Sequence, residues 1–177
     1  PMVYLMQLPA KRVRPVAVLM AHELFGGAPE GAMEEALGIE LFHNFTLMHD
    51  DIMDEAPLRR GRPTVHAKWN VNTAILSGDA MLVRTYMQMA ADARVMALFN
   101  EHALGVCEGQ QQDMAFEQRD DIGLEAYRGM IRLKTAVLLA CAMQVGAVRA
   151  KASEEDVQRI GEVGEHLGLA FQLRDDL

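Results

Sequence analysis

Apolar residues recur at three- and four-residue spacing along most of this 177-residue chain, which is the period of an amphipathic α-helix. Proline and glycine interrupt the pattern at residues 26–29 and 57–63, where we expect turns or loops. No stretch alternates polar and apolar residues convincingly, as a half-buried strand would. The pattern predicts an all-α bundle in a single domain. The expected helices span residues 15–24, 31–54, 73–93, 95–116, 124–147 and 154–176, with a short helical turn at 66–69.

Composition narrows the class of protein. Half of the residues are hydrophobic, aromatics make up only 6% and methionine is abundant at 13, so packing depends on aliphatic side chains and methionine. The net charge of -8 argues against a nucleic-acid partner. Cys107 and Cys141 form no paired motif, which fits a reducing compartment without structural zinc.

The longest apolar stretch bears on the cellular location of the protein, and the two ends of the chain bear on its extent. The stretch at 137–148 contains Gln144 and is too short to span a bilayer, and no signal peptide is visible, so we expect a cytoplasmic protein. The chain starts at Pro1 without an initiator methionine and stops at Leu177, directly after an Asp-Asp pair. We therefore expect the sequence to be part of a longer polypeptide.

A cluster of acids followed by arginines is the first chemical signal. Asp50, Asp51 and Asp54 lie within five positions, and Arg59 and Arg60 follow. Asp50 and Asp54 share one helix face because they are four residues apart. Crowded carboxylates suit a hard divalent cation such as Mg²⁺, and arginine suits a bidentate anion such as phosphate. The cluster predicts a phosphate-bearing substrate held with Mg²⁺; the alternative is a solvated helix face.

Two later features support the same chemistry. Asp175 and Asp176 form a second acid pair, one helical turn after Gln172. Lys134, followed by Thr135, lies in the middle of an otherwise apolar helix, where a lysine must either reach the surface or meet a negative partner. Two acid-rich helix ends that face each other could hold several Mg²⁺ ions, whereas a solvated terminal turn and a surface lysine are the simpler interpretations.

Five ordered segments together resemble the trans-isoprenyl diphosphate synthases, also called polyprenyl synthetases. The resemblance runs from residue 11 to residue 177, and implies an isoprenoid synthase-type helical bundle around a central apolar cavity, without the C-terminal helices of the family. One departure is Pro9-Ala10, where the family usually has two glycines. The segments are KRVRP at 11–15, HNFTLMHDDIMD at 43–54 with RRGRP at 59–63, GQQQDM at 109–114, KT at 134–135 and FQLRDD at 171–176.

The resemblance also implies an activity in isoprenoid biosynthesis. Family members are Mg²⁺-dependent prenyltransferases, usually homodimers, that condense an allylic diphosphate with isopentenyl diphosphate. By resemblance, Lys134, Thr135 and Arg59 are the catalytic residues, and Gln110 and Asp113 match a motif near the site without an assigned role. The remaining roles implied are Mg²⁺ ligands at Asp50, Asp54, Asp175 and Asp176, with Asp51 in the same motif; allylic diphosphate contacts at Arg59, Lys134 and Gln172; and isopentenyl diphosphate contacts at Lys11, Arg14, His43 and Arg60.

Product length is expected to depend on the floor of the apolar pocket. By resemblance, Phe45 and Thr46 occupy the floor positions, and a phenylalanine there indicates products of roughly C15 to C20. A helical wheel places Phe45 about 140° from Asp50 and Thr46 about 40° from it, so Phe42 is another candidate floor. Phe45 as an ordinary core residue is also left open.

Four other interpretations remain. The first two are a noncatalytic partner subunit of the same fold and a longer-chain polyprenyl diphosphate synthase. A terpene cyclase would need a second metal motif containing Asn and Ser or Thr, which residues 171–177 do not match. A carboxylate-bridged di-iron bundle would need two Glu-x-x-His motifs, and only Glu40 to His43 provides one.

Overall fold

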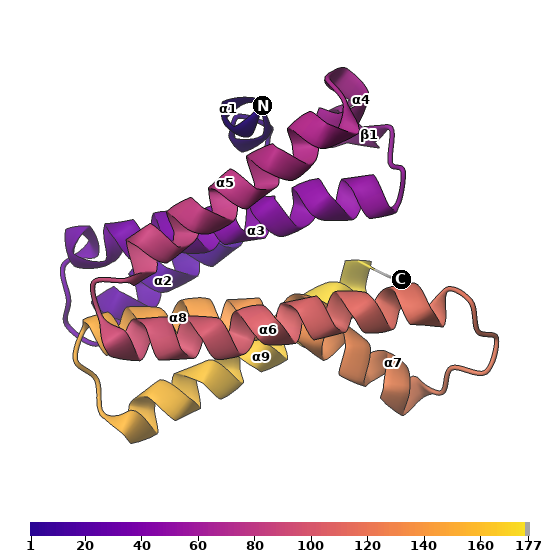
Figure 1. Cartoon of the computed structure of the whole chain (residues 1–177). Helices are drawn as coiled ribbons and strands as arrows, with labels where there is room; N and C mark the ends of the chain where they lie inside the picture. The colour runs from indigo at the N-terminus through magenta and orange to yellow at the C-terminus, as the bar shows by residue number, and fades with distance from the viewer. Residues whose placement is uncertain (176–177) are drawn as a thin grey trace.

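The computed structural model describes residues 1–175 and is almost entirely helical, which confirms the all-α prediction. Figure 1 shows two layers of helices, with α3 and α5 in one and α6, α8 and α9 in the other. Helix α2 packs against both α3 and α8 and so connects the layers. The helices are α1 Met2–Met6, α2 Val13–Leu24, α3 Met33–Met53, α4 Val65–Lys68, α5 Val71–Met89, α6 Ala93–Phe116, α7 Leu124–Ile131, α8 Val137–Arg149 and α9 Glu154–Asp175, with the 3₁₀ turn η1 Pro29–Ala32 and the π turn η2 Arg132–Ala136.

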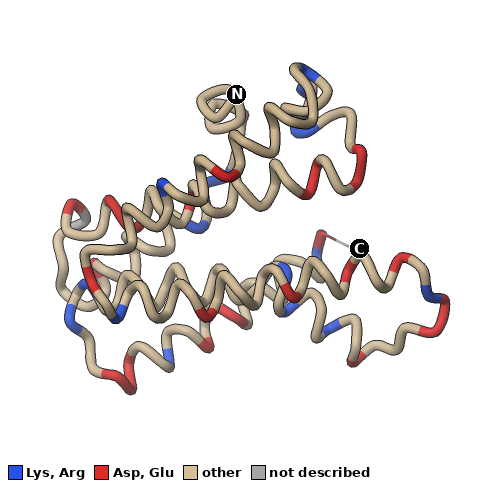
Figure 2. Tube along the Cα trace, viewed as in Figure 1, with Lys and Arg blue, Asp and Glu red and all other residues tan. Residues whose placement is uncertain are grey.

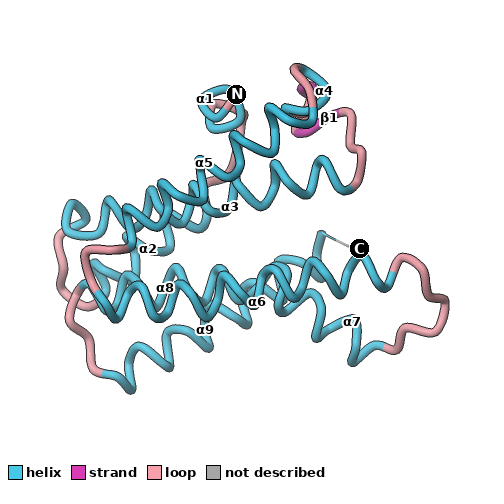
Figure 3. Tube along the Cα trace, in the orientation of Figure 1, coloured by secondary structure: helices cyan, strands magenta, loops and turns pink. Residues whose placement is uncertain are grey.

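Local sequence explains where several helices begin. The side chain of Asn70 accepts a hydrogen bond from the Thr73 backbone N–H at 2.8 Å, and Asp92 accepts one from the Arg94 N–H at 2.8 Å. Ser153 Oγ accepts from the Asp156 N–H at 3.1 Å. These N-caps satisfy backbone donors that have no partner within the helix. Loops are confined to the ends of the helices, as Figure 3 shows.

Two small elements were not expected from the sequence. Helix α1 precedes the first predicted helix, and residues predicted to be a loop contain the two-stranded hairpin β1 Leu58–Arg59 and β2 Arg62–Pro63. Arg60 and Gly61 form its turn with positive φ angles of 53° and 74°. Two central residues with φ > 0 are typical of the two-residue turns that match strand twist. The strands are too short to show an alternating pattern.

The segment predicted as one helix at 124–147 changes its winding in the middle. Helices α7 and α8 are joined by η2, a π-helical turn, into one continuous segment, Leu124–Arg149. This 26-residue segment is longer than the apolar stretch recognised in the sequence, and its length and hydropathy would allow it to cross a membrane. However, 67% of its most apolar window is buried inside the bundle. Packing in the core therefore accounts for its apolar character.

Candidate active site

The helices enclose a cavity of about 1320 Å³, which is lined from both layers of the bundle. Its apolar wall includes Val106, Leu138, Leu139 and Met143. Most of the residues singled out in the sequence line this one cavity. They are Lys11, Arg14, His43, Phe45, Thr46, Asp50, Arg59, Arg60, Lys134, Thr135, Gln172 and Asp175.

Two predicted metal ligands are placed differently. Asp54 is exposed at the C-terminal end of α3 and lies outside the lining formed by residues 1–175, although its charge raises the pKa of the nearby Asp50. Asp176 lies outside the described residues. Figure 2 shows acidic residues at the end of α3 and at the C-terminal end of α9 on the same side of the molecule. Asp50 and Asp175, from these two helices, line the same cavity.

The adjacent acids Asp50 and Asp51 on α3 have different surroundings. Asp50 lines the cavity, whereas Asp51 is 2% exposed and accepts hydrogen bonds from Arg59 Nε at 2.7 Å, with Arg59 Nη2 also 2.7 Å away. Arg59 Nη2 lies 3.7 Å from Asp50 Oδ2. Burial raises the pKa of both carboxyl groups, and the charge of Arg59 opposes this rise. Asp51 therefore orients Arg59 toward the cavity.

Lys134 meets the negative partners that its place in an apolar helix predicts. Its Nζ donates a hydrogen bond to Asp113 Oδ2 and lies 3.6 Å from Asp50 Oδ1. Burial lowers the pKa of Lys134, but the Asp113 hydrogen bond and the charges of both acids outweigh it, so the pKa lies above its ordinary value. Lys134 is therefore a cation held at the boundary between α3, α6 and η2.

Close helix packing places Lys134 and Thr135. A Cβ atom on Gly109 of α6 would lie 2.3 Å from the Lys134 backbone nitrogen, so only glycine permits this approach. Thr135 Oγ1 donates to Gln172 Oε1 at 3.1 Å and so links η2 to α9. π turns are frequently found at functional sites, because they shift the direction of side chains on a helix. The packing thus turns the Lys134-Thr135 pair toward the cavity.

A second group of cations lies at the N-terminal end of α2. Arg14 Nη1 donates to His43 Nε2 at 3.2 Å, so this ring nitrogen is an acceptor and the imidazole is neutral. Burial, followed by the charges of Arg14 and Arg60, lowers the pKa of His43 well below its ordinary value. Burial also lowers the pKa of Arg14 to about 10, and within the described part of the chain its buried Nε has no hydrogen-bond partner. A buried cation with an unused donor is suited to an anionic ligand.

We predict that the imidazole of His43 titrates well below 6.5 in the unliganded protein, and that a bound diphosphate raises its pKa, because added negative charge stabilises the imidazolium. Histidine NMR signals followed against pH, with and without pyrophosphate, measure both effects. The variant His43→Gln identifies the signal. A midpoint at or above 6.5 without ligand would contradict the prediction.

The acid residues fit a divalent cation, although the structure does not gather them tightly. Asp50 Oδ1 is buried, and among residues 1–175 it has no hydrogen-bond partner, which leaves a carboxylate oxygen available as a ligand. The negative charges of Asp54 and Asp113 act on Asp50, so a cation there would relieve repulsion. No group of three or more His, Cys, Asp or Glu side chains in this range is close enough to share an ion. Asp50 and Asp175 are thus the described acids of the cavity lining that would hold Mg²⁺, and Asp54 lies exposed one helical turn after Asp50.

The lining of the cavity distinguishes between the candidate floor residues. Phe45 and Thr46 both line the cavity, and the Phe45 ring stacks edge-on to His49 with centroids 4.7 Å apart. Phe42 is 1% exposed and instead packs against Phe99, with ring centroids 5.1 Å apart. The structure therefore places Phe45, and not Phe42, against the cavity.

Sequence reasoning missed two charged residues of the site. Arg12 and Glu40 line the cavity and form an ion pair with each other. Arg12 lies inside the KRVRP segment, and Glu40 was considered only as a possible iron ligand. Both residues lie between other site residues in the sequence, and this was the signal that could have identified them. Their contact with each other depends on the packing of α2 against α3.

Comparison with known proteins agrees with the family resemblance of the motifs, and it does so along the whole chain. The polyprenyl synthetase family model matches residues 1–177. A geranylgeranyl diphosphate synthase of Saccharolobus solfataricus is 39% identical over 176 residues, covering 94% of this chain and 53% of that protein. A (2E,6E)-farnesyl diphosphate synthase of Mycobacterium bovis is 40% identical over 172 residues, covering 94% of this chain and 48% of that protein.

Solved structures agree with the sequence comparison. A crystal structure of a geranylgeranyl pyrophosphate synthase superposes with a TM-score of 0.97 at 50% identity, covering 99% of this chain and 55% of that one. The chain spans about half the length of the curated relatives it matches. The match over all residues, together with the motifs that line one cavity, shows that this chain belongs to the polyprenyl synthetase family.

Proposed function

We propose that the protein is a Mg²⁺-dependent trans-prenyltransferase that condenses an allylic diphosphate with isopentenyl diphosphate. One observation carries the proposal: two groups of cations lie around a single cavity that also has an apolar wall. Arg59 and Lys134 lie beside Asp50, and Arg14 and Arg60 lie beside His43. Two diphosphates and one prenyl chain are the substrates that such a cavity fits.

Each group has a distinct task on this proposal. Lys134 and Arg59 donate to the allylic diphosphate and stabilise the negative charge that develops as its C–O bond breaks. Thr135 and Gln172 line the same end of the cavity, beside this diphosphate. Lys11, Arg14, His43 and Arg60 hold isopentenyl diphosphate, and Arg14 Nε is a donor with no partner among the residues that the structure describes. Mg²⁺, held by Asp50, Asp54, Asp175 and Asp176, would supply further positive charge for the departing diphosphate.

The apolar wall protects the reactive intermediate. Val106, Leu138, Leu139 and Met143 line the cavity and exclude water, which would otherwise capture the allylic cation. The isopentenyl double bond then forms the new C–C bond, and a proton is lost to the released diphosphate. No side-chain nucleophile is needed, so the binding residues carry the catalysis.

The direct test is incubation of the protein with Mg²⁺, radiolabelled isopentenyl diphosphate and each allylic primer in turn, followed by chromatography of the extracted lipid. We expect labelled prenyl diphosphate, and no product without Mg²⁺. A noncatalytic partner subunit of the same fold would give no product with any primer, and that result would contradict the proposal.

A di-iron carboxylate site is not supported. Its one candidate motif consists of Glu40, which is paired with Arg12, and His43, which accepts a hydrogen bond from Arg14. Both side chains therefore face cations rather than a metal. The proposal of Mg²⁺ rests instead on the carboxylates at the end of α3 and on Asp175.

We predict that Phe45→Ala shifts the products from roughly C15–C20 to longer chains, because removing the ring deepens the apolar part of the cavity. The lipid products, separated by chain length, measure the effect. Phe42→Ala is the comparison variant, since that ring is buried against Phe99 and packs on Phe45 with ring centroids 5.6 Å apart, but is not part of the cavity lining formed by residues 1–175. Unchanged product length in Phe45→Ala, or equal lengthening in both variants, would contradict the prediction.

We further propose that the protein is a cytoplasmic homodimer. Leu76, Val83 and Met87 on α5 and Leu104 on α6 are 60–70% exposed, and such apolar surface favours association. Cys107 and Cys141 are both free, as is usual in a reducing compartment. Sedimentation velocity tests the dimer, and cell fractionation tests the location; a monomer or a membrane-bound protein would contradict these assignments.

A further inference from the structure

Arg12 adopts a backbone conformation that its residue type disfavours. It is the N-cap of α2, with φ 51° and ψ 35° in the left-handed region. Residues other than glycine, asparagine and aspartate rarely adopt this conformation, and it persists where surrounding contacts impose it. Lys11 precedes this turn and Arg14 follows it, and all three side chains line the cavity. The contacts of Arg12 thus determine how the first cationic segment enters the site.

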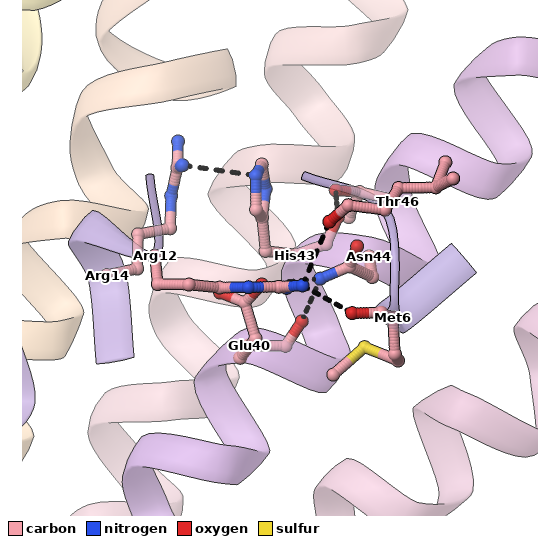
Figure 4. Close-up of polar contacts among 8 residues, drawn as sticks. Met6, Arg12, Arg14, Glu40, His43, Asn44 and Thr46 are labelled. Atoms are coloured by element: carbon pink, nitrogen blue, oxygen red, sulfur yellow. Dashed lines mark hydrogen bonds and ion pairs between the residues drawn. The ribbon is translucent and has the colours of Figure 1, made fainter. Parts of the chain in front are cut away.

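Both terminal nitrogens of the Arg12 guanidinium donate to protein groups (Figure 4). Its Nη1 donates to Glu40 Oε1, and its Nη2 donates to the carbonyl oxygens of Met6 and Leu8, the latter at 3.2 Å. These contacts join the end of α1, the turn before α2 and the middle of α3. Arg12 lines the cavity, but its terminal nitrogens are committed to the chain itself.

Glu40 is a rigid anchor for this contact. Its side chain is 6% exposed, and Asn44 Nδ2 donates both to the Glu40 carbonyl and to Glu40 Oε1, each at 2.8 Å. Asn44 is itself fully buried one turn further along α3. The carboxylate is therefore held by its own helix before it meets Arg12. Figure 4 shows Glu40 and Asn44 from α3 on one side of the Arg12 guanidinium, and the Arg14–His43 pair beside them.

We infer that Arg12 and Glu40 are positioning residues for isopentenyl diphosphate: their ion pair, formed by a partly exposed guanidinium and a buried carboxylate, imposes the left-handed turn and so presents Lys11 and Arg14 to the diphosphate. This inference rests on the proposed function and adds a division of labour within the KRVRP segment. Lys11 and Arg14 contact the substrate, and Arg12 contacts only the protein. The allylic side of the cavity, around Lys134 and Asp113, is held by other contacts.

Electrostatics alone would predict an opposite effect of Glu40. Its negative charge acts on Arg14 and Arg60, and it would repel a diphosphate bound to them. If charge were its main influence, Glu40→Gln would therefore tighten binding of isopentenyl diphosphate. If the ion pair positions Lys11 and Arg14, the same substitution weakens binding, since a small displacement of binding groups is costly. The sign of the effect separates the two roles.

The experiment compares Glu40→Gln, Arg12→Ala and the double variant with the unchanged full chain. We expect each single variant to raise the KM for isopentenyl diphosphate by about tenfold, with kcat and the KM for the allylic diphosphate within about twofold. The double variant should bind isopentenyl diphosphate no more weakly than the more impaired single variant, because both changes break the same Arg12–Glu40 contact. Calorimetric titration with isopentenyl diphosphate should show the same loss of affinity.

Glu35→Gln is the matched control for stability. Glu35 lies on the same helix, is 3% exposed, and pairs with Arg149 at 3.0 Å away from the cavity lining formed by residues 1–175. We expect it to lower the Tm without changing either KM. Arg12→Lys is a second test variant, because lysine keeps the positive charge but lacks the planar guanidinium that donates to several acceptors at once. It should also raise the KM for isopentenyl diphosphate selectively.

The outcomes distinguish this inference from the proposed function. Unchanged or tighter binding in Glu40→Gln, or equal effects on both substrates in Glu40→Gln and Arg12→Lys, overturns the positioning role while the proposed function stands. A tenfold loss in Arg12→Ala combined with additive effects in the double variant would show that Arg12 is itself a substrate ligand, which also overturns it. If the unchanged protein neither binds isopentenyl diphosphate nor makes product, both the proposed function and this inference fail.

Discussion

Replacing Lys134 with methionine is expected to lower kcat by about 10²–10³-fold, because one preorganised cation that stabilises the leaving diphosphate is lost. Methionine keeps most of the packing of the side chain within the π turn. The loss also leaves Asp113 and Asp50 without the cation that lies between them, with Nζ 3.6 Å from Asp50 Oδ1. We therefore expect the variant to bind the allylic diphosphate more weakly as well.

Steady-state kinetics with both substrates measure this effect, and circular dichroism reports on the fold. Lys151→Met is the control, since Lys151 is an exposed lysine beyond α8. Its kcat should equal that of the unchanged protein. A Lys134→Met variant that is folded and within threefold of normal kcat would remove Lys134 from the mechanism.

Asp50→Asn is expected to have the second large effect. The substitution keeps the size of the side chain but removes the charge that a hard cation needs, so the affinity for Mg²⁺ should fall and kcat should drop on the order of 10³-fold. The buried Asp50 Oδ1, which has no hydrogen-bond partner within residues 1–175, is the reason to choose this acid. Relief of burial and of repulsion from Asp54 should at the same time make the folded protein as stable or more stable.

A titration of activity against Mg²⁺ concentration, together with thermal unfolding with and without Mg²⁺, measures these effects. The unchanged protein should gain Tm on addition of Mg²⁺ and substrate diphosphate, and Asp50→Asn should gain less. Asp120→Asn is the control, because Asp120 is an exposed acid in the loop between α6 and α7. Normal activity and a normal Mg²⁺ response in Asp50→Asn would exclude Asp50 as a ligand.

The adjacent acids on α3 illustrate how far a motif can be interpreted. The spacing of Asp50, Asp51 and Asp54 indicated a metal site, but spacing alone does not say which acid faces the substrate. The structure shows Asp50 lining the cavity, Asp51 buried against Arg59, and Asp54 exposed. Successive helix residues differ by about 100° in direction, so the orientation of α3 against its neighbours determines which acid faces the cavity, which is buried and which is exposed.

The candidate floor of the cavity is a second case in which the local sequence does not say which side chain faces the cavity. A helical wheel left Phe42 and Phe45 as alternatives, because it carries no information on which neighbour covers each face. Phe42 packs on Phe99 of α6, whereas Phe45 lines the cavity, and the control of product length by Phe45 stays a prediction. Likewise, no local signal marks the π turn at Lys134; the close approach of Gly109 accompanies it.

The sequence by itself determined the helical class, the positions of the long helices and most of the charged residues that line the cavity, because helical periodicity and motif spacing are local properties of the chain. Only the tertiary structure decided which of two neighbouring charged residues is bound by other parts of the protein. Arg12 and Arg14 are two residues apart, yet Arg12 is bound to Glu40 and backbone carbonyls, whereas Arg14 has a buried donor that finds no partner within residues 1–175. That difference arises from contacts between helices far apart in the sequence, which no local pattern records.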